Sequence, residues 1–164
     1  MTKNKNMKFP DEAAIKYVLD YLDGIGVGVT EIAKLVSDNQ SKYSDQPIEF
    51  YEKNVRRVLR KREFLNNIMV MIFLDEADAK QLLPEPLSDI IGNDMFLFGV
   101  DEGLALQASQ VFGNIAITNY SYLDKTKPGI IGELDSSGGN TTFADDIISA
   151  IVASTAAHSA HEVA

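Results

Sequence analysis

The stretch GLALQASQVFGNIAITNYSYL, residues 103–123, is the longest uncharged run of the chain. Its 21 residues are long enough to cross a bilayer, but seven of them carry polar side chains, which argues against a membrane span. These seven are Gln107, Ser109, Gln110, Asn114, Thr118, Asn119 and Ser121. An uncharged but mildly polar helix is typical of a helix that others surround. We therefore expect residues 103–123 to form the central helix of the fold.

Helical periodicity continues on both sides of this run, whereas the alternation typical of strands is scarce. Further helices are expected from Asp11, after the glycine-rich turn 24–29, over 47–83 with a division near 61–63, over 87–91, and over 143–160. The sequence thus predicts an all-α fold of about six helices, with one central helix surrounded by the others. We expect a flexible N-terminal tail over residues 1–10 and a single helical domain over 11–164.

The composition is that of an ordinary globular protein, with 164 residues of which 45% are hydrophobic. The chain has no cysteine, which excludes disulfides, thiolate zinc sites, iron–sulfur clusters and cysteine nucleophiles. The N-terminal segment MTKNKNMKFPDE lacks the apolar region of a secretory signal. These features predict a cytoplasmic location.

Charge is distributed unevenly along the chain. Residues 1–80 hold 13 Lys and Arg and 13 Asp and Glu, whereas residues 81–164 hold 11 Asp and Glu and only two cations, Lys125 and Lys127. An acidic half of this kind indicates attraction to metal ions rather than to nucleic acid. A merely soluble acidic surface explains the same charge equally well.

Two pairs of carboxylates stand at expected helix starts. Asp101 and Glu102 open the predicted central helix, where the helix dipole favours acidic side chains. Asp145 and Asp146 open the last helix, and we expect Thr142 to be its N-cap with Asp145 completing a capping box. Either pair also offers the hard oxygen ligands that Mg²⁺ prefers. Since one cap does not need two carboxylates, Asp146 is free to face a metal.

The loop after the uncharged run begins with DKTKP, residues 124–128. It places a carboxylate and two ammonium groups within four residues of a half otherwise without cations. A carboxylate for Mg²⁺ beside a lysine for phosphate is a common division of roles in phosphoryl transfer. Asp135 and the pair Gly138–Gly139 close the same loop, where glycines would let the backbone approach a phosphate or would simply form a turn.

In combination, GVDE (99–102), LDKTKPGIIGELD (123–135), Gly138–Gly139 and DDIISAIVAS (145–154) resemble the phosphatidylglycerophosphatase A family. The chain looks closest to the soluble Gram-positive branch of low-temperature-requirement C proteins. This resemblance implies a Mg²⁺-dependent phosphomonoesterase that converts phosphatidylglycerophosphate to phosphatidylglycerol and phosphate. The substrate is then a phosphorylated lipid or a small phosphate ester.

The resemblance also assigns roles to individual residues. It implies metal ligands at Asp101, Glu102, Asp124, Asp145 and Asp146. It implies catalytic roles for Asp124, Lys127, Asp135 and Asp146, and substrate contacts from Lys125, Lys127, Gly138 and Gly139.

One geometric difficulty follows from the expected central helix. A straight helix from Asp101 to Leu123 would be ~34 Å long, so its two ends would not share one metal ion. Either Gly113 breaks the helix, or a site forms between subunits, or Asp101 and Glu102 are structural. We favour the last two alternatives, and we expect the protein to be a homo-oligomer.

Two other functions remain open. VTEIAKLVSDNQ (29–40) followed by the basic NVRRVLRKR (54–62) resembles a helix-turn-helix, although residues 42–48 make the gap longer than the usual turn. Since the acidic half would repel a duplex, we do not expect nucleic acid as a partner. The same basic helix would suit peripheral contact with anionic lipid headgroups. The other alternative is a non-catalytic metal-binding or assembly protein of the same fold.

Overall fold

The computed structural model describes residues 7–95, 99–136 and 142–163, and these residues form nine helices and no strand. The helices are α1 (Asp11–Gly24), α2 (Val29–Gln40), α3 (Ile48–Val58), α4 (Arg62–Ala79), α5 (Leu87–Gly92), α6 (Val100–Gln110), α7 (Asn114–Thr126), α8 (Ile130–Ser136) and α9 (Ala144–Glu162). The all-α class holds, but the expected number of about six helices was wrong.

Two local features account for the additional helices. Gly113 has φ +80°, a left-handed conformation that an α-helix cannot contain, and it separates α6 from α7. The loop expected after residue 124 contains the seven-residue helix α8, whose Ile131 is fully buried. By contrast, the expected division of 47–83 occurs where it was placed, between α3 and α4.

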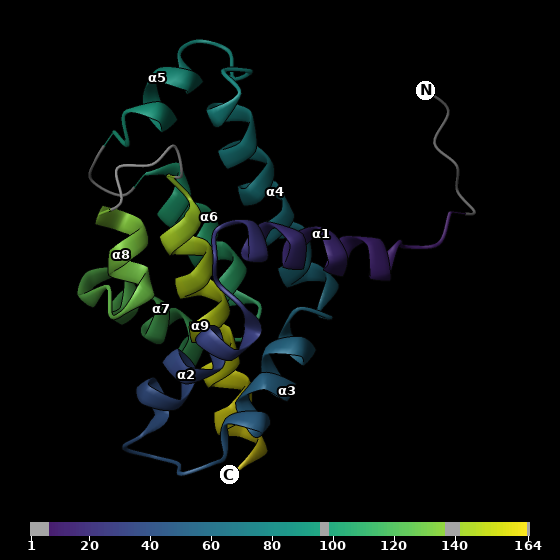
Figure 1. The fold of residues 1–164 in the computed structure, drawn as a ribbon, viewed down its shortest axis with the longest axis vertical. Coiled ribbons are helices and arrows are strands. Elements are labelled where there is room, and N and C mark those ends of the chain that lie inside the picture. The colour runs from purple at the N-terminus through teal and green to yellow at the C-terminus, as the bar shows by residue number, and fades with distance from the viewer. Residues whose placement is uncertain (1–6, 96–98, 137–141, 164) are drawn as a thin grey trace.

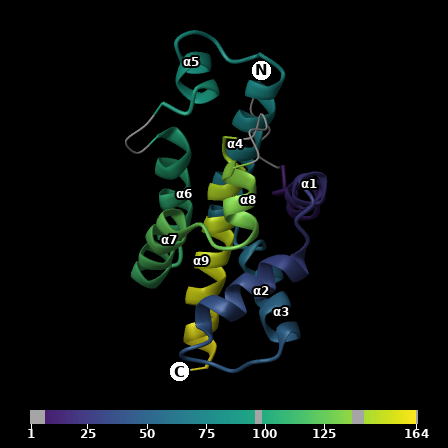
Figure 2. The same cartoon turned by 60° about the vertical axis from the view of Figure 1, so that its left-hand side comes forward.

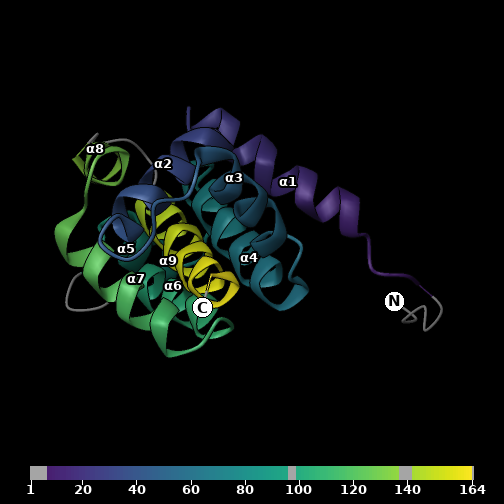
Figure 3. The ribbon, with the colours of Figure 1, turned by 90° about the horizontal axis from the view of Figure 1, so that it is seen from below.

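The central helix is α9, and not the run 103–123. Figure 3 shows α9 surrounded by its neighbours, and it packs against α2, α3, α4, α6, α7 and α8. Fifteen of its 19 residues are buried. Alanine and serine dominate its sequence, and such small side chains allow helices to approach closely from every side.

The outer helices hold α9 with its first turn toward one end of the molecule. In Figures 1 and 2, α5 and α6 lie near the N-terminal end of α9, while α2 and α3 lie beside its C-terminal half. The largest fully buried side chains, among them Tyr51, Phe64 and Tyr120, fill the space between α9 and this shell. No helix in the described part of the chain is both long and apolar enough to cross a bilayer.

Candidate functional site

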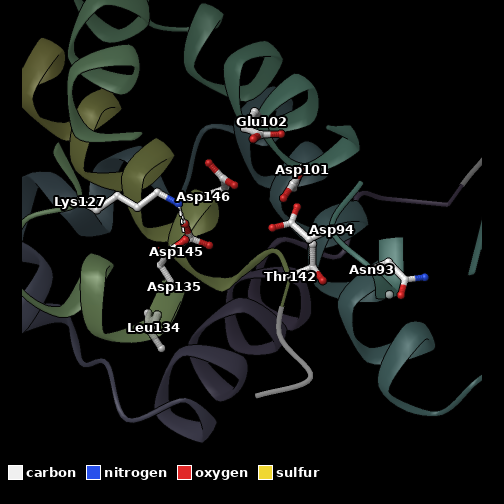
Figure 4. A pocket seen from close by; sticks show the side chains of 11 residues that line it. Asn93, Asp94, Asp101, Glu102, Lys127, Leu134, Asp135, Thr142, Asp145 and Asp146 are labelled. Atoms are coloured by element: carbon white, nitrogen blue, oxygen red, sulfur yellow. Dashed lines mark hydrogen bonds and ion pairs between the residues drawn. The ribbon is translucent and has the colours of Figure 1, made fainter. Parts of the chain in front are cut away.

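A polar cavity of about 270 Å³ lies at the N-terminal end of α9. Its walls come from four parts of the fold: the α5–α6 connection, the start of α6, the α7–α8 segment and the start of α9. The lining residues are Gly92, Asn93, Asp94, Asp101, Glu102, Lys127, Leu134, Asp135, Thr142, Asp145 and Asp146. Figure 4 shows carboxylates from opposite walls facing the same space.

Lys127 is the only cation among the described lining residues. It follows the last turn of α7 in a left-handed conformation with φ 41°, and its N–H donates to the carbonyl of Leu123 at 2.7 Å. Its Nζ donates to Asp135 and, at 3.0 Å, to Oδ2 of Asp145. Burial lowers the pKa of Lys127, but these two carboxylates outweigh burial and raise the pKa above its usual value. The ammonium group is therefore firmly charged.

Asp146 is the most enclosed carboxylate of the cavity, with 3% of its surface exposed. The hydroxyl of Tyr120 on α7 donates to its Oδ1 at 2.5 Å. Burial, followed by the charge of Asp145, raises the pKa of Asp146 to about 8 despite this hydrogen bond. Burial also raises the pKa of Asp145, although Lys127 opposes the shift. The start of α9 thus holds two buried carboxyl groups close together, and this crowding disfavours the ionised form of Asp146.

The start of α6 supplies the opposite wall. Glu102 accepts a hydrogen bond from the Gly99 N–H and so caps its own helix, while Asp101 is 5% exposed. Burial and the adjoining Glu102 raise the pKa of Asp101. A Cβ on Gly99 would meet carboxylate oxygens of Asp101 and Glu102, so both side chains would have to shift to accommodate it.

The break at Gly113 removes the difficulty of a 34 Å helix. Because α6 and α7 are separate, Asp101 and Glu102 line the same cavity as Lys127 from the far end of α7. All lining residues come from one chain, so the cavity needs no second subunit. Glu102 does have the structural role of a cap, but it also faces the cavity.

The expected capping box at the start of α9 was wrong. The N-cap is Phe143 rather than Thr142, and the cap has no side-chain hydrogen bond of its own. Thr142 instead donates to the carbonyl of Ile91 at 3.1 Å. The N–H of Phe143 donates to Oδ1 of Asp75 on α4 at 3.2 Å. The start of the helix is therefore fixed from other elements.

Several residues assigned from the sequence lie away from the cavity lining. Asp124 is half-buried and does not line the cavity, although the charges of Glu102 and Asp135 affect its pKa. Burial is the main cause that raises the pKa of Asp124. Lys125 is exposed and also outside the lining. Gly138 and Gly139 lie outside the described residues.

Sequence reasoning missed three polar residues of this region. Asp94 lines the cavity with φ 45°, a conformation that aspartate tolerates better than most residues. Tyr120 supports Asp146, and Asp75 supports the start of α9. The one signal available was Asp75, which ends the uncharged run Phe64–Leu74 and yet continues the same helix.

The carboxyl groups that line the cavity are of the chemical type that binds a divalent cation such as Mg²⁺. Within the described ranges, no three carboxylate or imidazole groups are already arranged to hold a metal ion. Mg²⁺, however, keeps several water molecules and often takes only one or two carboxylates from a protein. The cavity offers carboxylate oxygens whose mutual repulsion a cation would relieve, and burial has removed much of the water that would otherwise screen them.

The basic segment 54–62 covers the end of α3 and the start of α4, and three of its arginines form ion pairs within the chain. Arg57 forms an ion pair with Glu162, Arg60 with Glu12 at 3.5 Å, and Arg62 with Asp11 at 2.7 Å. α2 and α3 do pack together, with residues 41–47 between them. Arginines engaged in this way have less positive charge to offer a duplex or an anionic surface.

Comparisons with known proteins place this chain in a family. The chain is similar to two uncharacterized proteins of Bacillus subtilis, YpjQ (39% identity, 94% of this chain and 88% of YpjQ) and YutG (45% identity, 83% and 84%). It is also similar to the crystal structure of a low temperature requirement C protein from Listeria monocytogenes, with TM-score 0.85, 41% identity, and coverage of 93% of this chain and 98% of that chain. The family model for phosphatidylglycerophosphatase A matches residues 22–161. The chain therefore belongs to the phosphatidylglycerophosphatase A family, as the motifs of its C-terminal half predicted.

Proposed function

We propose that the chain is a Mg²⁺-dependent phosphomonoesterase that hydrolyses phosphatidylglycerophosphate to phosphatidylglycerol and phosphate in the cytoplasm. The observation that carries the proposal is one cavity in which the acidic first turns of α6 and α9 face Lys127. Family membership supports the class of substrate. Facing carboxylates beside one ammonium group suit the joint binding of a divalent cation and a phosphate.

Each side chain then has a role that follows from its position. Asp101, Glu102, Asp145 and Asp146 would hold Mg²⁺, whereas Asp124 lies outside the cavity lining. The bound ion would supply Lewis-acid polarisation of the phosphoryl group. Lys127 would pair with the phosphate oxygens, and Asp135 would keep the ammonium group aimed at them. Tyr120 would keep Asp146 in one orientation.

The size of the cavity supports a headgroup rather than a whole lipid as its occupant. A space of about 270 Å³ lined by polar groups holds a phosphate and part of a glycerol, but not acyl chains. The acyl chains would remain outside, which implies peripheral contact with a membrane during turnover. A soluble phosphate ester would meet the same cavity without that contact.

The direct test is phosphate release from phosphatidylglycerophosphate in mixed micelles and from glycerol 3-phosphate, with and without Mg²⁺. We expect Mg²⁺-dependent release from the lipid. Asp146→Asn keeps the shape of the side chain but removes a charge at the cavity, and it should lower kcat by about 10²-fold or more. Asp89→Asn on α5 is the matched control, because Asp89 is exposed and does not line the cavity.

Release from neither ester in the presence of Mg²⁺ would overturn the proposal. If Mg²⁺ still raised the melting temperature of that inactive protein, the non-catalytic metal-binding alternative would stand instead. Release from glycerol 3-phosphate alone would keep the reaction and exclude the lipid as substrate.

A further inference from the structure

We propose that Asp75 on α4 is a positioning residue that sets the acidic first turn of α9 in place. The inference rests on the proposed function, since it concerns the carboxylates assigned to that reaction. Asp75 does not line the cavity and would touch neither substrate nor metal. It acts through the backbone that carries Asp145 and Asp146.

Both oxygens of Asp75 are used, and they join three helices. Oδ1 accepts the N–H of Phe143, the residue immediately before α9, at 3.2 Å. Oδ2 accepts the hydroxyl of Tyr21 from α1 at 2.8 Å. Asp75 is 3% exposed, and Phe143 is fully buried. One buried carboxylate therefore links α1, α4 and the start of α9.

A carboxylate at position 75 is buried, and its removal from water costs free energy. It follows an uncharged run of eleven residues, Phe64–Leu74, and a buried carboxylate costs free energy unless it is fully hydrogen-bonded. The first N–H groups of a helix need acceptors, and the N-cap residue of α9 supplies none. Asp75 meets that need from a separate element, which fixes the position of the helix end as well as its hydrogen bonding.

The helix end matters because the acids follow it within one turn. Asp145 and Asp146 are the second and third residues of α9, and their other contacts come from α7 and its C-cap: Lys127 to Asp145, and Tyr120 to Asp146. Those contacts hold the side chains, whereas Asp75 holds the backbone from the α4 side. Without it, the remaining side-chain hydrogen bonds of the described residues at this helix start would be those of Lys127 and Tyr120 and that of Thr142 to Ile91, and none of them holds the Phe143 N–H.

The test compares Asp75→Ala, Asp75→Asn and Tyr21→Phe in the full chain. Asp75→Ala should lower kcat for phosphate release about 10- to 100-fold with KM changed less than about threefold, because a displacement near 1 Å costs this much in a preorganised site. Asp75→Asn should recover most of the rate, since its amide oxygen accepts the Phe143 N–H and its amide nitrogen donates to Tyr21. Tyr21→Phe should fall between the two.

Two readouts without turnover accompany the kinetics. The Phe143 amide should exchange with solvent at least about tenfold faster in folded Asp75→Ala, and not in Asp75→Asn. Affinity for Mn²⁺, measured by paramagnetic resonance, should weaken in Asp75→Ala. Asp78→Asn is the matched control, because Asp78 is on the same helix and lines a different cavity, beside Gln81 and Ser88.

The outcomes separate this inference from the proposed function. A folded Asp75→Ala variant with wild-type kcat, Mn²⁺ affinity and Phe143 exchange would overturn the positioning role while leaving the phosphatase intact. Equal losses in Asp75→Ala and Asp75→Asn would also overturn it, since shape and hydrogen bonding would then not suffice. If wild type released no phosphate, the proposed function would fail, and the exchange and Mn²⁺ results would decide the role of Asp75.

Discussion

Among single residues, Lys127 occupies the most constrained position of the cavity. Its backbone takes a left-handed turn at the end of α7, and its side chain reaches both α8 and α9. Because the lining is otherwise neutral or acidic, one ammonium group offsets part of the charge that Asp135 and Asp145 bring. Under the proposed function, the same group would pair with an incoming phosphate.

Lys127→Met should therefore lower kcat/KM for phosphate release by about 10- to 100-fold, the usual value of a hydrogen bond to a charged group. Methionine keeps the length of the side chain and removes the charge, so the fold should persist. Steady-state kinetics measure the effect, with the exposed Lys80→Met on α4 as the control. Unchanged kcat/KM would contradict the role of Lys127.

His158 offers a second prediction, on stability rather than activity. Burial, followed by the charges of Arg57 and His161, lowers the pKa of His158 below 6.5. Glu162 lies 3.9 Å away, but it is already paired with Arg57. The folded protein thus binds the proton less readily than the unfolded chain does. The stabilisation that neutral His158 provides is therefore fully present above pH 6.5. It is lost as the pH falls from 6.5 through the lower pKa of His158 in the folded state.

Denaturant unfolding at several pH values on either side of 6.5 checks this prediction. Relative to wild type, His158→Gln should lose less stability on acidification, because its side chain does not titrate. His161→Gln, at an exposed position in the last turn of α9, is the comparison variant. The same pH dependence in wild type and His158→Gln would contradict the prediction.

Residue-level reasoning named part of the cavity lining. The acids at helix starts and Lys127 were visible because their types and order form a motif. Asp94 has no local feature that distinguishes it from other carboxylates, and the position of Asp75 at the end of an uncharged run does not reveal its partner. Asp94 acquires its place from the connection between α5 and α6, and Asp75 from the packing of α4 beside Phe143.

At the scale of elements, the short helix α8 sets the position of Asp135 relative to Lys127. The two segments meet closely at Gly132, where an added Cβ would lie 2.5 Å from the carbonyl oxygen of Lys127. A backbone atom cannot yield as a flexible side chain does, so α8 would have to move. Asp135 is three residues further along α8 and would move with it.

Gly132→Ala should therefore destabilise the protein by about 1–3 kcal/mol, the usual cost of overpacking, and should also lower phosphatase activity. Denaturant unfolding and kinetics at a temperature where the variant is folded separate the two effects. Gly24→Ala is the matched control: no atom lies within 4 Å of its added Cβ, so it should be neutral or slightly stabilising. Equal behaviour of the two variants would contradict the steric argument.

The boundaries of elements were predicted less well than their types. Gly113 is one glycine among others, and its left-handed backbone appears only once α6 and α7 turn back on each other. α8 is short, contains Gly132 and follows Pro128–Gly129, which reads locally as a turn. In both cases, tertiary packing decides between a loop and a helix that local preferences leave balanced.

For the whole molecule, the proposed metal site predicts a link between metal binding and stability, because a cation would favour the ionised forms of the crowded carboxyl groups in the cavity. A cation that binds only the folded chain stabilises it by about 2.7 kcal/mol at a concentration 100 times its dissociation constant. Mg²⁺ should thus raise the melting temperature of wild type above its value in EDTA. Differential scanning calorimetry, with sodium ions at matched ionic strength as the control, measures the shift.

Asp146→Asn should reduce this rise of the melting temperature in Mg²⁺. Because burial and Asp145 already disfavour the ionised form of Asp146, an uncharged amide should cost little there: the variant should melt no lower than wild type in EDTA and should respond less to Mg²⁺. Identical melting responses in the two proteins would count against Asp146 as a ligand.

At this scale, the all-α class could be predicted from periodicity, but the choice of central helix could not. Residues 103–123 lack charge, which favoured them as the central helix. The small side chains of α9, and not a lack of charge, decided which helix is central. They let six helices pack against α9 at once, although its first turn carries two acids.

That placement ties the chemistry of this protein to its architecture. The acid pair stands in the first turn of the helix against which six other helices pack, so the packing of the core and the position of these acids depend on the same element. A substitution that changes how α9 packs in the core is therefore expected to change the position of Asp145 and Asp146 as well. Divergence of specificity is therefore expected to arise in the short connecting segments at the rim, and not in the interior.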